Sequence, residues 1–377
     1  MKIAIFSDTF EKGYGGVTVY ARENAFFMLK NHHDVKVFTW NTKNLTNEEK
    51  KICRLFPCIN IVKSARGKAG FAPIKILEEV KRFRPNVIHN HSLFTMGIHA
   101  IFCAKMLNIP LIHHFHTYLE EHYHYIPLLK NFPQFTKYLI RKETTHFFNT
   151  ANLVIAPTKI IKNYLVSIGI KKHIEILPFG IDTSLFVPSD KKEKKFTLLY
   201  VGRLLKEKKV DLIIKSFALF SKHKNDVQLK IVGRGTEEEN LKILAKKMNV
   251  LEKITFIPWL EREKLPHIYN SSHVFIILSN IETFGIVVLE AMASGLPVIA
   301  ADNLALSEHV KNGYNGYLTD VDDISKIADK MEVIYKNARL REFLSLNSRK
   351  YALNFDIKKI FKKLEYIYKS IDKYKYK

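Results

Sequence analysis

The chain is poor in cysteine, glycine and proline: its 377 residues include 3 Cys, 15 Gly and 12 Pro. Cys53, Cys58 and Cys103 are too few and too irregularly spaced for a disulfide framework or a zinc site, so a reducing cytoplasm is expected. Sparse glycine and proline, together with 47% hydrophobic residues, argue against disorder. A chain of this length has enough apolar material for two or three domains.

Long apolar runs are also missing. No uninterrupted stretch reaches the ~18 residues that a membrane-spanning helix needs. Residues 1–8 form a short apolar run that is typical of a buried strand, and they lack the features of a signal peptide. We therefore expect any membrane contact to be peripheral.

Acidic residues are outnumbered: 37 Asp and Glu stand against 60 Lys and Arg, which gives a formal net charge of +23. This charge predicts attraction to a polyanion, either nucleic acid or an anionic membrane surface. A Lys-rich proteome would produce the same excess, so charge alone does not identify a partner.

Short β-rich apolar runs alternate with helical patterns in two series, which predicts an α/β protein with two parallel sheets, each covered by helices. We expect two doubly wound, Rossmann-like domains facing a ligand cleft near the carboxyl ends of the strands. The predicted strands are Ile3–Phe6, Val35–Thr39, Val87–His89, Leu111–His114 and Leu153–Ala156, then Phe196–Val201, Gln228–Val232, Ile254–Ile257, Val274–Leu278 and Pro297–Ala300.

A polar, proline-containing stretch at residues 177–195 separates the two series and predicts the linker. The expected domains are therefore residues 1–188 and residues 189–356. Residues 357–377 predict a C-terminal helix, which carries an apolar stripe and could pack back on the first domain. The stripe consists of Ile360, Phe361, Leu364, Ile367, Tyr368 and Ile371.

The most informative stretch is residues 282–299, where Glu282 and Glu290 flank a glycine turn and the start of an apolar helix. Free N–H groups at a helix start can hold an anion such as a diphosphate. A carboxylate beyond the phosphates could bind a ribose, and one on the near side could meet a sugar. The arrangement suits a nucleotide-sugar.

This stretch, with its Glu-Thr-Phe-Gly and Glu-Ala-Met-Ala-Ser-Gly-Leu-Pro-Val sequences, resembles the Glu-x7-Glu signature of retaining glycosyltransferases of family 4. That family has the two-domain GT-B fold. The resemblance implies that Glu282 contacts a hexose, that Phe284, Gly285 and Ile286 bind the nucleotide-sugar, and that Glu290 binds the ribose.

Two further segments match donor-binding motifs of the family. Gly15 and Gly16 follow the first predicted strand and resemble the Gly-Gly-Val loop that faces the donor phosphates. Arg203 and Lys208 follow the first strand of the second domain, in a stretch similar to the family's Gly-Arg…Glu-Lys-Gly-Val-Asp pattern, and can neutralise a diphosphate. Lys209 departs from this pattern, because the family usually has glycine there.

Three histidines, His113, His114 and His116, gather at a strand end. His-x-His spacing is compatible with a metal, but no acidic or cysteine partner accompanies it, so we expect no metal. A buried, hydrogen-bonded core residue is the simpler interpretation for His113 or His114. His116-Thr117 resembles the family motif whose histidine contacts the hexose. We also expect no metal at Asp320-Val321-Asp322, which should instead cap the next helix.

Residues 116–127 resemble the acceptor-side stretch of family members that glycosylate diacylglycerol, and residues 90–97 match the same subgroup. The resemblance implies an acceptor side formed by Tyr118, Glu120, Glu121 and His124. It implies retaining transfer of glucose or galactose from a UDP-sugar to the 3-hydroxyl of 1,2-diacylglycerol, without a cofactor. The expected partners are then a UDP-hexose, diacylglycerol and an anionic membrane surface.

Such an enzyme should attach peripherally to the inner face of the cell membrane, through basic and aromatic surfaces of its first domain. Residues 50–84 are rich in Lys and Arg and include Phe56 and Phe71, and residues 125–148 mix aromatic and basic side chains.

Three other hypotheses remain: a family-4 enzyme with another acceptor (a lipopolysaccharide core sugar or phosphatidylinositol), a basic nucleic-acid-binding protein, and a non-catalytic sugar-nucleotide-binding subunit. The residues after His116 disfavour the first. No nucleic-acid-binding motif supports the second, so no specific nucleic acid is expected. The intact set of candidate site residues disfavours the third. The oligomeric state stays open.

Overall fold

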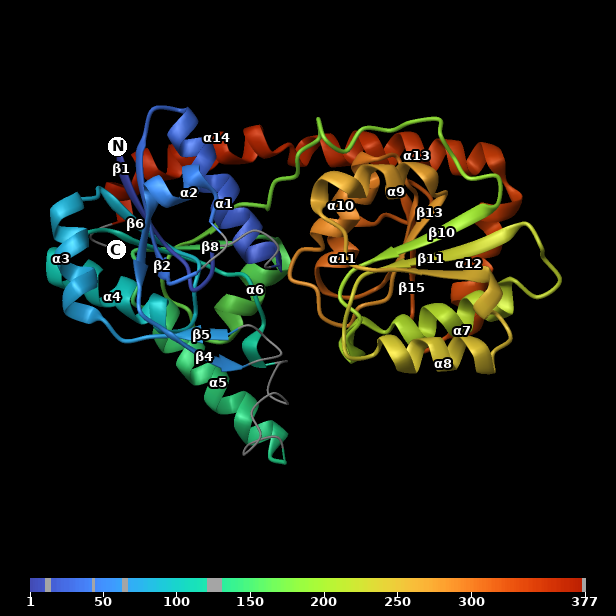
Figure 1. Cartoon of the computed structure of the whole chain (residues 1–377), viewed down its shortest axis with the longest axis horizontal. Coiled ribbons are helices and arrows are strands. Elements are labelled where there is room, and N and C mark those ends of the chain that lie inside the picture. Colours follow the sequence, from blue (N-terminus) through green and yellow to red (C-terminus); the bar gives the residue numbers. More distant parts are fainter. Residues whose placement is uncertain (11–14, 43–44, 63–66, 121–130, 375–377) are drawn as a thin grey trace. The chain divides into compact units, whose positions relative to one another are not determined.

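The computed structural model describes residues 1–10, 15–42, 45–62, 67–120 and 131–374. The chain divides into two compact units, one formed by Met1–Gly180 with Lys358–Lys377 and the other by Ile181–Ile357 (Figure 1). Among the described residues, no helix combines the length and the apolar character needed to cross a membrane.

The first unit contains a seven-stranded sheet in the order β3-β2-β1-β6-β7-β8-β9, in which all neighbouring strands are parallel. A separate antiparallel pair, β4 and β5, follows β3 in sequence. The strands are β1 (Lys2–Phe6), β2 (Asp34–Trp40), β3 (Cys53–Phe56), β4 (Ile59–Val62), β5 (Gly67–Ala69), β6 (Val87–Asn90), β7 (Leu111–His114), β8 (Leu153–Ala156) and β9 (Ile174–Ile176).

Helices cover both faces of this sheet. On one face, α3 and α4 bury Ile76, Val80 and Ala100 in a core that includes Phe6 and Trp40. On the other face, α1 and α14 contribute aromatic side chains that pack together. The helices of this unit are α1 (Gly15–Lys30), α2 (Asn47–Ile52), α3 (Pro73–Phe83), α4 (Thr95–Leu107), α5 (Pro133–Phe148), α6 (Lys159–Ser167) and α14 (Ile357–Lys369).

The second unit contains a six-stranded parallel sheet in the order β12-β11-β10-β13-β14-β15. Its strands are β10 (Phe196–Val201), β11 (Val227–Val232), β12 (Ile254–Ile257), β13 (Val274–Ile277), β14 (Val298–Ala301) and β15 (Gly316–Thr319). Every residue of β10, β13 and β14 is buried, as expected of central strands that are covered on both faces.

The helices of the second unit complete a core that joins α7, α8 and α12 to the sheet through buried residues such as Ile213, Phe217, Leu241 and Met331. They are α7 (Val210–Phe220), α8 (Glu238–Lys247), α9 (Leu265–Ser271), α10 (Ile286–Ala293), α11 (Leu304–His309), α12 (Ile324–Lys336) and α13 (Ala338–Ala352).

The strand predictions are confirmed, each within one residue of the observed bounds. The prediction of two Rossmann-like parallel-sheet domains is confirmed with them. The sequence missed the short strands β3, β4, β5, β9 and β15. These segments have only three or four residues, too few to show a periodic pattern, so their pairing depends on neighbours that are distant in the sequence.

The division between the units falls at Gly180 and Ile181, before the boundary expected after residue 188. Backbone hydrogen bonds explain the difference. Ile181 bonds to Phe355 and Ile357, and the Arg349 guanidinium donates to the carbonyl oxygens of Thr183 and Phe186. Residues 181–188 are therefore held by the second unit.

The C-terminal stripe predicted from the sequence is buried at all six positions. Within the first unit, the Tyr368 hydroxyl lies 2.6 Å from Nδ1 of His89 and accepts a hydrogen bond from Asn24 of α1. His33 and Glu365 form an ion-pair contact at 3.1 Å. The helix α14 is thus an integral part of this unit.

A buried carboxyl group follows β1. One oxygen of Asp8, Oδ1, accepts hydrogen bonds from Nε1 of Trp40 at 3.0 Å and from the backbone N–H of Met96 at 3.1 Å. Burial raises the pKa of Asp8 to about 6, against the opposing effect of these hydrogen bonds. Ionised Asp8 therefore costs stability at neutral pH.

This shift predicts a specific pH dependence for Asp8→Asn. The folded-state pKa lies above the unfolded value, so wild-type stability is lost as pH rises from about 4 through 6. Asparagine does not ionise, so the stability of the variant relative to wild type should increase by roughly 2 kcal/mol between pH 4 and pH 7. Urea unfolding of both proteins across this range measures the difference, and a difference that is constant with pH would contradict the assignment.

Candidate active site

The topology of the second sheet locates one half of the site. The strand order reverses between β10 and β13, because β11 and β12 lie on one side of β10 while β13, β14 and β15 lie on the other. Doubly wound sheets bind ligands at such a reversal, next to the carboxyl ends of the strands. Lys208 and Glu282 come from the two loops that leave this point.

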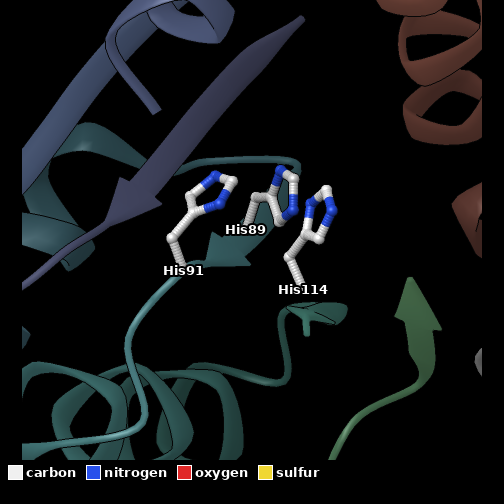
Figure 2. Close-up of side chains that lie close together, drawn as sticks. All are labelled: His89, His91 and His114. Carbon is white, nitrogen blue, oxygen red and sulfur yellow. The ribbon is translucent and has the colours of Figure 1, made fainter. Parts of the chain in front are cut away.

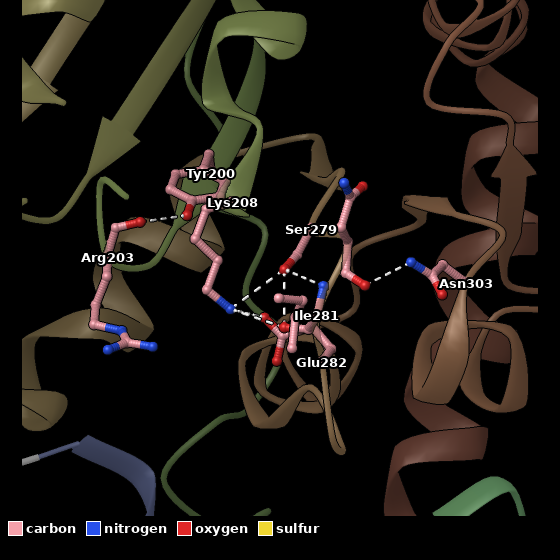
Figure 3. Close-up of polar contacts among 8 residues, drawn as sticks. Tyr200, Arg203, Lys208, Ser279, Ile281, Glu282 and Asn303 are labelled. Atoms are coloured by element: carbon pink, nitrogen blue, oxygen red, sulfur yellow. Dashed lines mark hydrogen bonds and ion pairs between the residues drawn. The ribbon is translucent and has the colours of Figure 1, made fainter. Parts of the chain in front are cut away.

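The Lys208 ammonium is the centre of a hydrogen-bond network (Figure 3). It donates to Oε1 of Glu282 at 2.5 Å, to Oγ of Ser279 at 3.3 Å and to the carbonyl oxygen of Ile281 at 3.3 Å. Lys208 is 9% exposed, and the side chain of Glu282 is mostly buried as well. The network joins the loop after β10 to the loop after β13 and presents a cation and a carboxylate together.

Lys209 occupies the position where the family usually has glycine. Its backbone is left-handed, with φ 52° and ψ 36°, and it ends the short turn Lys206–Lys208 (η2) before α7. Glycine favours this conformation because it has no Cβ, whereas other residues adopt it at a cost. Lys209 therefore adopts the backbone conformation that glycine favours.

The loop that carries Arg203 packs against a neighbouring glycine loop. A Cβ on Gly233 would lie 1.9 Å from the carbonyl oxygen of Gly202, and one on Gly235 would lie 1.9 Å from that of Leu204. The close backbone approach explains why both positions are glycine, and it fixes the loop from which the exposed Arg203 side chain extends.

The start of α10 is formed as the sequence predicts. Gly285 is its N-cap residue, with φ 79°, and as glycine it offers no side chain to cap the helix. Ile286 is the first helical residue. Phe284 is 1% exposed and its carbonyl oxygen accepts a hydrogen bond from Nε2 of His309 at 2.8 Å. Phe284 thus anchors the turn from within the core, while Gly285 and Ile286 form the helix start.

Glu290 lies on the second turn of α10 and is buried. Both of its carboxylate oxygens have protein partners: Nε of Arg262 donates to Oε1 at 3.0 Å, and the hydroxyl of Tyr269 donates to Oε2 at 3.3 Å. Burial raises the pKa of Glu290, and Arg262 opposes this shift. The two glutamates of the signature are therefore in different surroundings, one paired with Lys208 and the other with Arg262.

The first sheet has its own reversal of strand order, between β1 and β6. Gly15, with φ 57°, and Gly16 open α1 in the connection from β1, and both are exposed. His91 follows β6, and His116 follows β7, the next strand. The candidate residues of this unit therefore lie on connections that leave the carboxyl ends of β1, β6 and β7.

His116 is 8% exposed and lies in an aromatic environment. Its ring stacks on Phe179 with centroids 5.2 Å apart, and its Nε2 lies 2.9 Å from Nδ1 of His91. Burial lowers the pKa of His116, with a further contribution from His91, so the imidazole is neutral at neutral pH. A neutral ring held in this way can accept or donate a single hydrogen bond to a ligand.

Two of the predicted acceptor-side residues are described by the structure, and both are buried. Tyr118 packs against Phe115 and Tyr164. Glu120 forms a salt bridge with Arg141 of α5, in which Nη2 of Arg141 donates to Oε1 at 3.2 Å. The other two, Glu121 and His124, lie outside the described residues.

Two interpretations of the sequence are wrong, and a third holds for only one of the two histidines to which it was applied. His113 is hydrogen-bonded in the core, to Asn90 and Thr150, whereas neither ring nitrogen of His114 has a partner among the described residues. The cap of α12 is Asp323, whose side chain accepts from Lys326, and not residues 320–322. Phe56 is not a surface residue, because β3 packs it beside Phe38 in the core.

Several residues of the site have no motif that would identify them in the sequence. Ser279 contacts Lys208, and Arg262 and Tyr269 contact Glu290, only because neighbouring strands and helices bring them together. His91 does carry a signal, since His-x-His occurs at both 89–91 and 114–116 on consecutive predicted strands.

Comparisons with known proteins identify the family and the fold of the chain. The family model described as Glycosyltransferase Family 4 matches residues 14–185, and the model described as Glycosyl transferases group 1 matches residues 182–351. The crystal structure of Anabaena HepE in complex with UDP-glucose superposes with a TM-score of 0.79 at 18% identity, and the match covers 98% of this chain and 100% of that protein.

Two curated relatives match most of the chain. The alpha-monoglucosyldiacylglycerol synthase of Streptococcus pneumoniae is 28% identical over 338 residues, which cover 84% of this chain and 75% of the relative. The sulfoquinovosyl transferase of Arabidopsis thaliana is 27% identical over 325 residues, which cover 80% of this chain and 60% of the relative. Together with the two family models, they establish that the chain belongs to the glycosyltransferases of family 4 and has the GT-B fold.

Proposed function

We propose that this glycosyltransferase transfers glucose or galactose from a UDP-sugar to the 3-hydroxyl of 1,2-diacylglycerol, with retention at the anomeric carbon. The observation that carries the proposal is the contact of Lys208 with Glu282 at the reversal point of the second sheet. A cation for the leaving diphosphate and a carboxylate for the sugar are held side by side there. The diacylglycerol synthase relative supports the choice of acceptor.

The donor is held mainly by charge and by the start of α10. Arg203 and Lys208 neutralise the diphosphate, and the N–H groups that follow Gly285 and Ile286 add to the positive potential. Glu290 receives the ribose hydroxyls, which join its existing bonds to Arg262 and Tyr269. Gly15 and Gly16 allow the backbone to approach the phosphates closely. Because protein side chains supply the positive charge, the reaction as proposed needs no metal cofactor.

Each unit offers one candidate hexose contact, Glu282 in the second unit and His116 in the first. Each group can bond a sugar hydroxyl, Glu282 as an acceptor and neutral His116 through one ring nitrogen. Transfer takes place on one face of the sugar, and the departing phosphate accepts the proton of the attacking hydroxyl. Catalysis then consists mostly of positioning and of stabilising charge on the leaving group.

The buried acceptor-side residues have a positioning role in this proposal. The salt bridge of Glu120 with Arg141 ties the segment after β7 to α5, and Tyr118 anchors the same segment in an aromatic cluster. Loss of either would displace the chain that leads away from His116.

Exposed apolar side chains with basic neighbours support contact of the first unit with an anionic membrane surface. Phe71 is 85% exposed, and Ile74 and Phe94 are also exposed. At the start of α5, Phe132, Phe135 and Tyr138 are exposed as well. Aromatic side chains beside lysines suit the boundary between headgroups and acyl chains. A diacylglycerol acceptor requires such a surface, and the inner face of the cell membrane is the proposed location.

The direct test of this proposal is lipid transfer. Purified protein is incubated with radiolabelled UDP-glucose or UDP-galactose, in separate reactions, with mixed micelles of diacylglycerol and anionic lipid. We expect label in the organic phase with one of the two donors, which identifies the sugar. Release of UDP without any lipid product would refute diacylglycerol as the acceptor, while a UDP-sugar would stand as the donor.

Glu282→Gln separates sugar contact from nucleotide binding. If Glu282 acts on the hexose, the variant should lose at least about 100-fold in transfer rate, as expected for loss of a transition-state contact. Its affinity for UDP should stay within about two-fold of wild type, because Lys208 keeps its bonds to Ser279 and Ile281. The exposed Glu261→Gln is the matched control. Full transfer activity in folded Glu282→Gln would remove Glu282 from the site.

A further inference from the structure

Four histidines lie on one face at the ends of two neighbouring strands of the first unit. The strands β6 and β7 pair in parallel with His89 opposite Ile112 and Asn90 opposite His113. Successive strand residues point to opposite faces, so His89 and His114 share a face while His113 points to the other. His91 and His116 follow two residues later on each chain segment.

Three of these rings, those of His89, His91 and His114, lie side by side (Figure 2). The ring centroids are 4.1 Å apart for His89 and His91, 5.4 Å for His89 and His114, and 5.5 Å for His91 and His114. Each ring offers one nitrogen such that the three nitrogens lie within 4.8 Å of one another. All three residues are at most 4% exposed.

Within the described part of the chain, these converging nitrogens have no hydrogen-bond partner. Among the described residues, Nε2 of His89, Nε2 of His91 and both ring nitrogens of His114 are buried without a hydrogen bond. A buried polar atom without a partner is unfavourable and rare, and four in one cluster require an explanation. One ligand that accepts lone pairs from several of these nitrogens explains why they have no protein partner among the described residues.

The contacts on the far side of two rings are compatible with that arrangement. Nδ1 of His89 lies 2.6 Å from the Tyr368 hydroxyl, and Nδ1 of His91 lies 2.9 Å from Nε2 of His116. When Nδ1 carries the proton and donates it to these partners, Nε2 has a free lone pair directed into the cluster. Histidine ligands of metals are usually oriented in this way. Burial also lowers the pKa of His91 to about 3, so its ring is neutral.

We propose that His89, His91 and His114 bind one divalent transition-metal ion of the zinc class. Three imidazoles without a carboxylate suit Zn²⁺, Co²⁺, Ni²⁺ or Cu²⁺, and they exclude the oxygen-seeking Mg²⁺ and Ca²⁺. Tetrahedral bonds of about 2.0–2.1 Å place ligand nitrogens roughly 3.4 Å apart, so the rings must rotate inward by about an ångström. The sequence alone did not suggest this site, because the trio considered there was His113, His114 and His116.

The metal site itself does not depend on the proposed function. The effect of the ion on the position of His116 does rest on the proposed function. His91 bonds the ion through Nε2 and His116 through Nδ1, so a bound metal fixes the orientation of His116. The metal takes no part in the transfer step.

The test uses full-length protein without a histidine tag, freed of metal with a chelator and then titrated with Co²⁺ or Zn²⁺. We expect one ion per chain, the visible d–d absorption of cobalt bound by nitrogen ligands, and a rise in Tm. The rise should be roughly 3–4 °C at a free metal concentration about 100 times Kd. These readouts need no substrate, so they stand or fall independently of glycosyl transfer.

Variants identify the ligands. His114→Phe keeps the ring that stacks on His116, at 4.5 Å, but removes both unpartnered nitrogens. It should abolish the cobalt absorption and the metal-dependent rise in Tm, while its Tm without metal is equal to or above that of wild type. Tyr368→Phe should weaken binding about 10-fold by loosening His89. The exposed His223→Gln should leave the affinity for metal unchanged.

Two results would overturn the proposal. Equal binding by wild type and His114→Phe would place the ion on surface histidines. Absence of binding by wild type, with His114→Phe more stable than wild type, would identify the cluster as a neutral stack of buried rings.

Discussion

A buried lysine ammonium is the constraint on which the proposed donor site depends. Lys208 must have acceptors around it, since a buried charge without hydrogen bonds is strongly unfavourable. Ser279, Ile281 and Glu282 supply those acceptors from the loop after the neighbouring strand β13. The left-handed turn at Lys209 then directs the chain into α7. The charge, the loop and the reversal of strand order therefore act as one unit, and this unit is where we propose that the diphosphate and the sugar bind.

In the first unit, the alternation of strand residues between the two faces of the sheet gives neighbouring histidines different surroundings. On one face of its sheet, His113 is satisfied by Asn90 and Thr150 in an ordinary core. On the other face, neighbouring histidines have converging nitrogens for which the described part of the chain provides no hydrogen-bond partner. Adjacent residues in the sequence thus have opposite surroundings. The proposed metal site and the proposed sugar contact of His116 both arise from the same face.

Much of this could be predicted from the sequence. Periodicity of apolar residues located the central strands, because buried parallel strands are continuous apolar runs. The signature residues Glu282, Gly285 and Glu290 were visible as a local pattern around a helix start. The partners of those residues were not visible. Arg262 and Tyr269 bond Glu290 from another element, and His91 meets His116 across two strands. Such contacts follow from strand order and register, which local patterns do not encode.

The most direct test of the account is the affinity of the protein for UDP when the Lys208 charge is removed. Isothermal titration of UDP is compared for wild type, Lys208→Met and Lys206→Met, an exposed lysine two residues away. If Lys208 holds the diphosphate, Lys208→Met loses at least about 10-fold in affinity, as expected for loss of a charge-assisted bond, and Lys206→Met binds as wild type does. Wild-type affinity in folded Lys208→Met would contradict the central claim, because the donor would then be bound elsewhere.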